Sequence, residues 1–189
     1  MERSAVYRRA LAPIMLFAGV LGMIAATVGI KWQMDRTRAF DGLWLATAAV
    51  AIVGAFAIAR RQSIKHREPF WSPPTRRVGQ ALLPPLAAGM MLGLLFLFSD
   101  TLVDLTLPLT FFWMLFYGCA LHSAGFFMPR GVKWFGWIFI LCAFAWVVIV
   151  SIWPEFIPKA NWIMGFFFGV LHLAYGVYLY LTEKGKNAA

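Results

Sequence analysis

Two histidines have the surroundings in this sequence that most clearly suggest a site. His172 lies in the apolar stretch FGVLHLAYG and His122 lies in FYGCALHSAG, and each has glycines three and four residues away. Side chains spaced by three and four residues share one face of a helix. Because small residues let helices approach closely in lipid, we expect each imidazole to point toward a neighbouring helix and to need a polar partner there.

Three hypotheses describe what these histidines do. In the first, each neutral imidazole forms a hydrogen bond with a neighbouring helix, through Tyr117, Tyr175 or Ser123. In the second, His172 is the polar element of a small-molecule or ion site, with Tyr175, Tyr117 and Trp113 beside it. In the third, both imidazoles are axial ligands of a haem or another pigment, although a rise of about 1.5 Å per residue places them about 7 Å apart along the helix axes.

Catalytic and metal sites have no matching set of residues in the sequence. The apolar stretches contain no carboxylate to pair with a histidine, and the chain has no glycine-rich phosphate loop. Zinc sites usually require roughly three or four N, S or O ligands, and we expect Cys119 and Cys142 to be buried as small apolar side chains. The sequence therefore predicts neither catalytic residues nor metal ligands, and a protein that is not an enzyme.

Long apolar segments position these residues and dominate the sequence. Of the 189 residues, 61% are hydrophobic and 13% are charged, whereas a soluble domain has about 25% charged residues. Continuous apolar runs cross a bilayer as helices, which takes about 17 to 25 residues each. Six segments without Asp, Glu, Lys or Arg meet this length, at about 11–30, 42–59, 78–98, 107–127, 134–153 and 162–181. We therefore expect residues 1–189 to form a single all-α transmembrane domain of six helices in three hairpins.

The placement of charge predicts how these helices are oriented. The chain has 17 Lys and Arg against 8 Asp and Glu, and its formal net charge is +9. With the N-terminus inside, 13 of the basic residues lie on the inner side and four on the outer side. This inner excess is the positive-inside bias, so both termini are expected in the cytoplasm. The net charge then faces anionic lipid headgroups, and we expect the lipid bilayer, not nucleic acid, as its partner.

One connection carries a large share of the basic residues. The segment RRQSIKHREPFWSPPTRR, residues 60–77, lies on the predicted inner side. We expect Phe70 and Trp71 at the level of the headgroups, where aromatic rings are favoured, and Arg76 and Arg77 beside lipid phosphates. Ser72 followed by two prolines predicts a helix start with serine as N-cap. Two interpretations stay open for this segment: an anchor at the membrane interface, or a docking surface for another membrane or cytoplasmic protein.

Glycines recur at spacings of three and four along several of the apolar segments. This spacing places them on one face of a helix, and small residues are typical of helix interfaces in membranes. The predicted packing positions are Gly19, Gly22, Gly29, Gly89, Gly93, Gly118, Gly125, Gly165, Gly169 and Gly176.

Two segments resemble a known group of proteins. EPFWSPPTRRVGQALLPPLAAG, residues 68–89, and FGVLHLAYGVYLYLTEKG, residues 168–185, resemble segments of uncharacterised bacterial six-helix membrane proteins, which have a WSPPTRR-like entry to helix three and a GxLH closing helix. This resemblance implies a multi-pass protein of the bacterial cytoplasmic (inner) membrane and implies no activity. His172 matches the closing-helix pattern, whereas His122 does not belong to it.

From these observations we expect a non-catalytic membrane component, an accessory subunit or regulatory partner of a membrane complex that binds its partner through residues 60–77. The alternative is a binder or transporter of a small molecule or ion with a polar site around His172. A protein that binds haem or a pigment through His172 is the third hypothesis, and otherwise no cofactor is expected.

Overall fold

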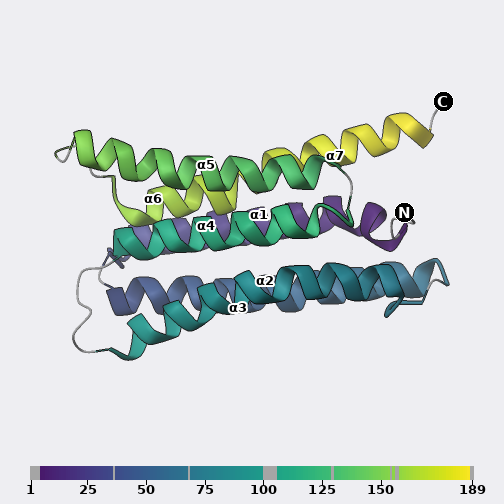
Figure 1. The fold of residues 1–189 in the computed structure, drawn as a ribbon, viewed down its shortest axis with the longest axis horizontal. Helices are drawn as coiled ribbons and strands as arrows, with labels where there is room; N and C mark the ends of the chain where they lie inside the picture. Colours follow the sequence, from purple (N-terminus) through teal and green to yellow (C-terminus); the bar gives the residue numbers. More distant parts are fainter. Residues whose placement is uncertain are drawn as a thin grey trace.

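The computed structural model describes residues 5–35, 37–67, 69–99, 106–128, 130–153, 155 and 158–187. Its elements are α1 (Ala5–Lys31), α2 (Thr37–Lys65), α3 (Pro73–Phe98), α4 (Thr106–Ala124), α5 (Arg130–Ile152), α6 (Ala160–Met164), the π-helix η1 (Gly165–Val170) and α7 (Leu171–Asn187). Because α6, η1 and α7 follow one another without a break, they form one rod (Figure 1). Six helices of the described chain are thus long and apolar enough to cross a membrane, and this confirms the predicted all-α fold and indicates a multi-pass membrane protein.

Several helices extend beyond the predicted apolar segments. α2 begins at Thr37 and ends at Lys65, where we had expected 42–59, because helical hydrogen bonding continues through polar residues once a long apolar helix has formed. α4 instead ends at Ala124, three residues before the predicted end, since the following residues form turns from Gly125 onward. After α2 the backbone of Arg67 is left-handed, with φ 54°, as is typical of the residue that follows a helix.

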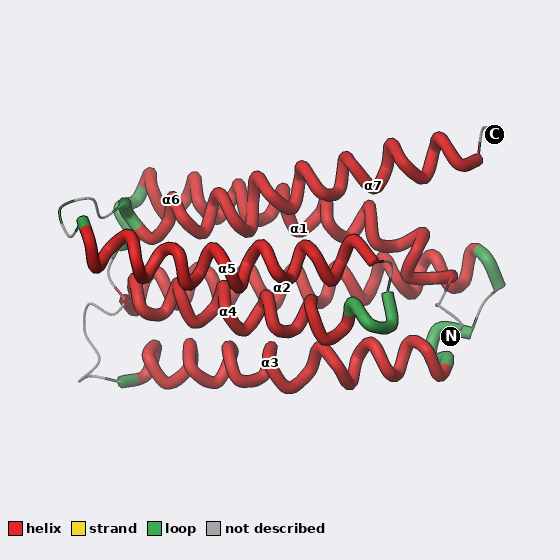
Figure 2. The backbone as a smooth tube through the Cα atoms, turned by 45° about the horizontal axis from the view of Figure 1, so that its top comes forward, coloured by secondary structure: helices red, strands yellow, loops and turns green. Residues whose placement is uncertain are grey.

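The six rods pack side by side in the order of the chain. α1 packs against α2, α2 against α3, α3 against α4 and α4 against α5, and α1 also packs against η1 and α7. Figure 1 shows α5 and α7 at the top, α4 and α1 in the middle and α3 and α2 at the bottom, and Figure 2 shows the same bundle after a turn of 45°. The predicted division into three hairpins and the cytoplasmic termini stay predictions.

Glycines set the spacing between α1 and the rod of η1 and α7. A Cβ added at Gly19 would lie 2.7 Å from Leu173, and one at Gly176 would lie 2.9 Å from Leu16. A Cβ at Gly22 would collide with the backbone carbonyl of Phe168. Because backbone atoms cannot move aside as a flexible side chain can, this interface requires a glycine at position 22.

The α4–α5 pair is packed in the same way. A Cβ at Gly118 would lie 2.9 Å from the carbonyl oxygen of Gly136, and one at Gly136 would lie 2.6 Å from the backbone nitrogen of His122. Gly136 was not among the predicted packing positions, because its partner Gly118 lies on another helix and no glycine precedes or follows it at helical spacing. At Gly89, by contrast, a Cβ would lie 3.5 Å from Phe116, which is an ordinary contact.

Candidate functional site

His172 lies at the point where the last rod changes from a π-helix to an α-helix. The π-helix spans Gly165–Val170, and the N–H of Leu171 donates to the carbonyl of Phe166, five residues earlier. π-helices are rare and frequently occur at functional sites. The first turn of α7 then places His172 in the interior, where 1% of its surface is exposed.

Both ring nitrogens of His172 have partners. Nδ1 lies 2.9 Å from the carbonyl oxygen of Phe167, and Nε2 lies 2.6 Å from the hydroxyl of Tyr117 on α4. A carbonyl can only accept, so Nδ1 carries the hydrogen and donates it. In the neutral imidazole Nε2 is then the acceptor, and the Tyr117 O–H donates to it. The Tyr117–His172 hydrogen bond therefore joins α4 to α7, with a fixed direction.

Aromatic rings surround this pair. The centroids of Phe135, Phe139 and Phe168 lie 5.2, 5.7 and 5.9 Å from the centroid of the His172 imidazole, and that of Tyr117 lies 5.4 Å away. The Phe168 ring is stacked on the imidazole, and the Phe135 and Phe139 rings meet it edge to face. Such an apolar shell strengthens the two hydrogen bonds, because no water competes for the nitrogens.

Tyr175 lies one turn after His172. It forms no hydrogen bond with His172, but both side chains contact the ring of Phe135. The Tyr175 ring stacks on Phe135 at 4.5 Å. Its hydroxyl is buried and finds no hydrogen-bond partner in the described part of the chain. A Cβ at Gly131 would lie 2.7 Å from this hydroxyl, so a glycine is needed on α5 to admit it.

His122 belongs to a different cluster of rings. Its imidazole meets Phe126 at 5.4 Å and Trp137 at 5.2 Å, and these rings do not contact His172. Within the described residues, its buried Nδ1 has no hydrogen-bond partner. Axial ligation of a haem by both histidines would require Nε2 of His172 to give up Tyr117, and the two imidazoles to leave separate clusters.

Trp113 also lies away from His172, against a separate cluster of buried apolar side chains that includes Phe40 and Phe96. Its Nε1–H donates to the carbonyl of Gly89 at 2.9 Å, and its ring stacks on Phe40 at 5.9 Å. The structure thus joins Tyr117 to His172, places Tyr175 beside them, and separates His122 and Trp113 from them.

A polar network at the start of α6 was not predicted from the sequence. Asn161 is fully buried; its Oδ1 accepts from Trp44 Nε1 at 3.0 Å, and its Nδ2 donates to the carbonyl of Met34 at 3.0 Å and to Asp35 at 3.2 Å. Asp35 also pairs with Lys159 at 3.2 Å. Asn161 lies one residue before the predicted segment 162–181, and an isolated asparagine there gave no signal of a long-range partner.

Asp41 is a second group whose place differs from expectation. It precedes the predicted segment 42–59 by one residue, so the sequence places it outside the expected span. The structure instead places it inside α2 with 0% of its surface exposed. Neither carboxylate oxygen has a hydrogen-bond partner among the residues described. Over the same residues, no three His, Cys, Asp or Glu side chains form a set that could hold a metal ion.

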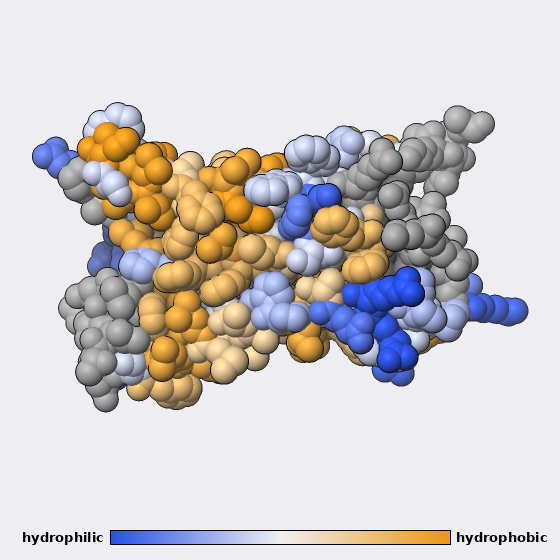
Figure 3. All heavy atoms as spheres, viewed as in Figure 1, coloured by the Kyte–Doolittle hydropathy of each residue, from blue (hydrophilic) through white to orange (hydrophobic). Residues whose placement is uncertain are grey.

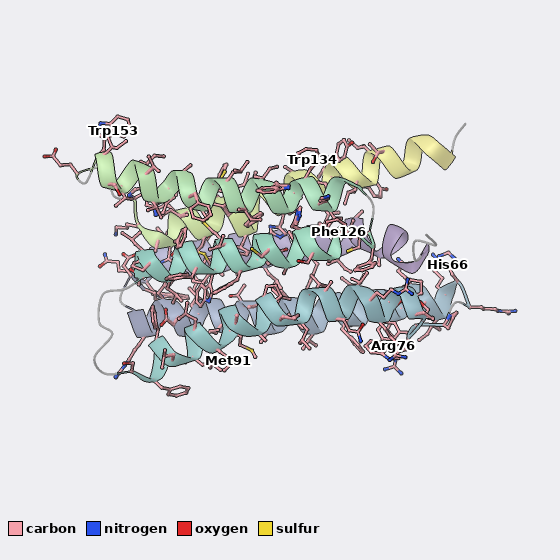
Figure 4. The ribbon with its side chains drawn as sticks, viewed as in Figure 1. His66, Arg76, Met91, Phe126, Trp134 and Trp153 are labelled. Atoms are coloured by element: carbon pink, nitrogen blue, oxygen red, sulfur yellow. The ribbon has the colours of Figure 1, made fainter. Side chains whose placement is uncertain are left out.

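The segment 60–77 has an exposed, basic surface, and one of its two aromatic rings packs against α2. Phe70 meets Phe56 of α2 edge to face at 4.8 Å, whereas Trp71 is 63% exposed. α3 begins at Pro73 with Ser72 as its N-cap, as predicted, but the Ser72 hydroxyl bonds to the hydroxyl of Thr75 at 3.0 Å and not to a backbone N–H. Figure 4 shows Arg76 and His66 at the same end of the bundle, opposite Trp153.

Comparison with known proteins identified no relative of this chain. No model of a protein family, no curated protein and no solved structure matches the chain.

Proposed function

We propose that this multi-pass membrane protein is a non-catalytic component of a membrane complex, an accessory subunit or regulatory partner. The closed Tyr117–His172 pair carries this proposal. Both imidazole nitrogens are occupied and four rings enclose the imidazole, so this buried polar pair serves helix packing. With the interior used in this way, we assign the function to the outer surface. The excess of Lys and Arg at one end supports a place in the bacterial cytoplasmic membrane with both termini inside.

The partner-binding part in this proposal is the hairpin of α2 and α3 with its connection, residues 60–77. α2 and α3 are the two least buried of the six apolar helices. Large apolar side chains project from them, including Val53, which is 69% exposed, and Met91, which is 67% exposed. Together with the exposed Trp71 they offer apolar surface to a second membrane protein. Exposed apolar patches of this kind are typical of protein or membrane contacts.

Co-purification from native membranes tests the proposal. The protein, extracted gently, is expected to bring a defined second protein with it. Scrambling the order of residues 70–77 should release that protein, because composition is kept while the placement of Phe70 and Trp71 is lost. A Trp153→Ala variant, changed at the opposite end, serves as the control and should retain it. If the protein purifies alone, or if the scrambled variant retains the same partner, the proposal fails.

A binder of a small molecule or ion is the second candidate, and the Tyr175 hydroxyl favours it. This hydroxyl is buried beside Phe135 and is unpaired within the described chain. The expected sign is a small molecule that co-purifies with the wild type and is lost from Tyr175→Phe. Tyr178→Phe is the matched control, because Tyr178 lies close by in sequence and is 60% exposed. Identical small-molecule content in the wild type and Tyr175→Phe would exclude a site at this hydroxyl.

A further inference from the structure

The end of the bundle formed by the α2–α3 connection has a strongly basic surface. Its members are exposed side chains at the end of α2, in the connection and at the start of α3: Arg60, Arg61, Lys65, Arg67, Arg76 and Arg77. Figure 3 shows blue groups gathered at this end, beyond the orange apolar band that covers the middle of the molecule. No carboxylate in the described part of the chain pairs with any of these six side chains, so their donors face outward.

Two arginine pairs within this surface lie at the same boundary. Arg60 and Arg61 directly follow the last residue of the apolar run in α2, and Arg76 and Arg77 directly precede the apolar run of α3. Because α2 packs against α3, both pairs lie where the apolar part of the hairpin ends. Guanidinium groups bind phosphate oxygens through two parallel hydrogen bonds, so four of them at one level match a layer of phosphates.

The aromatic residues of the connection mark the same level. Phe70 packs on Phe56, and its ring lies 6.2 Å from that of Trp71. Trp71 projects outward, as tryptophans do at the headgroup region of a bilayer. Toward the middle of the helices the surface becomes apolar, with exposed Phe56 on α2 and Leu83 on α3. A ligand that covers this surface therefore combines an anionic head with an apolar tail.

We propose that the basic surface of residues 60–77 binds the headgroups of anionic phospholipids. Phosphatidylglycerol presents a phosphate to the arginine pairs and acyl chains to the apolar sides of α2 and α3, so it satisfies both parts of the surface. An acidic segment of a soluble protein would satisfy only the basic part. The site goes beyond the proposed partner binding, because it requires only the purified protein and lipid.

Lipid selection by the purified full-length protein tests this site. The protein is solubilised in mixed micelles of phosphatidylglycerol and phosphatidylcholine, isolated, and its retained lipids are quantified by mass spectrometry. The wild type is expected to enrich phosphatidylglycerol at least about fivefold, since each Lys or Arg near an anionic surface favours binding by about that factor. A variant with Arg60, Arg61, Arg76 and Arg77 all changed to Gln should lose the enrichment, whereas the same four changed to Lys should keep most of it.

Three controls make the result decisive. Lys31→Gln, which removes an exposed charge at the far end of α1, should leave the enrichment unchanged. Circular dichroism and thermal unfolding of the Gln variant should match the wild type, because the changed side chains are exposed. High salt, which shortens the screening length to about 3 Å at about 1 M, should reduce the enrichment.

Two results would overturn the proposal. One is an equal phosphatidylglycerol content in the wild type and the Gln variant. The other is release of an acidic protein partner by the Gln variant with no change in lipid content, which would make the surface a protein-docking site. If no second protein co-purifies with the wild type while its lipid enrichment is present and is lost in the Gln variant, that result would count against the proposed function alone.

Discussion

At the scale of single residues, the interior of the bundle depends on a hydrogen bond between two helices. Tyr117 of α4 donates to His172 of α7, whose other nitrogen is held by the carbonyl of Phe167. A buried acceptor that loses its donor retains the full cost of having left water. Loss of the Tyr117 hydroxyl should therefore destabilise the fold by more than the net energy of the hydrogen bond alone. Replacing Tyr117 by Phe, which removes one oxygen atom, measures this change.

We expect Tyr117→Phe to lower the free energy of unfolding by about 1 kcal/mol. Interhelical hydrogen bonds in membranes average about 0.6 kcal/mol, and an unsatisfied buried acceptor costs about 1 to 3 kcal/mol. Unfolding in micelles with increasing denaturing detergent measures the change. Tyr178→Phe removes an exposed hydroxyl and is the control that should remain close to the wild type. Equal stability of Tyr117→Phe and the wild type would show that the bond does not hold α4 to α7.

At Asp41 we expect a substitution that stabilises the protein, unlike the one at Tyr117. Its carboxylate is fully buried and has no hydrogen-bond partner among the described residues, and a buried charge without a partner is costly. We therefore expect Asp41→Asn, which keeps the shape and removes the charge, to raise the unfolding temperature. Asp35→Asn is the matched control, because Asp35 pairs with Lys159 and accepts from Asn161, and its change should lower the temperature or leave it unaltered. A lower temperature for Asp41→Asn would mean that the carboxylate is stabilised where it lies.

At the scale of helices, close packing through glycine decides which rods are neighbours. The α1 face with Gly19 and Gly22 lies against η1 and the start of α7, and the α4 face with Gly118 lies against Gly136 of α5. In lipid the hydrophobic effect gives no preference for one helix face over another, so close van der Waals contact takes its place. A methyl group placed in such a contact forces the helices apart.

Gly22→Ala is expected to destabilise the bundle by about 1 to 3 kcal/mol, because its Cβ would collide with the backbone of Phe168. Gly79→Ala on α3 is the matched control. Nothing lies within 4 Å of a Cβ at Gly79, so alanine there should stabilise the helix by up to about 1 kcal/mol. Thermal unfolding of both variants gives the comparison. The packing account is wrong if both changes have the same sign and size.

The positions of the six helices could be predicted from the sequence, but the π-helix within the last one could not. The six apolar segments were located to within a few residues, since length and hydropathy alone decide whether a helix can span a bilayer. The π-helix at Gly165–Val170 could not be predicted, because GFFFGV has no local signal that distinguishes it from an α-helix. Its register depends on the contact of Gly165 with Ala26 and of Gly169 with Met23, which belong to another helix.

The candidate site could be predicted only in part, for the same reason. The helical face that carries Gly169, His172 and Gly176 was visible in the spacing, and Tyr117 was among the possible partners of the histidine. Which partner is used depends on how α4 and α7 are rotated against each other. The Asn161 network depends on residues more than a hundred positions apart, such as Trp44, and spacing within one segment carries no information about them.

At the scale of the whole molecule, the interior and the surface have separate tasks. The rods close on one another around aromatic side chains, and polar and charged groups concentrate at the ends (Figure 3). The basic end, the exposed Trp71 and the apolar sides of α2 and α3 all belong to these two helices and the connection between them. We therefore propose that contact with another membrane protein and with anionic lipid lies on this part of the chain.

Photocrosslinking in native membranes tests this central claim most directly. A photoreactive residue at Met91, on the exposed side of α3, is compared with one at Phe144, on the exposed side of α5 (Met91 is labelled in Figure 4). The account predicts a discrete protein adduct from position 91 and only lipid adducts from position 144. Lipid adducts alone from both positions would contradict it, because the α2–α3 hairpin would then face nothing but the bilayer.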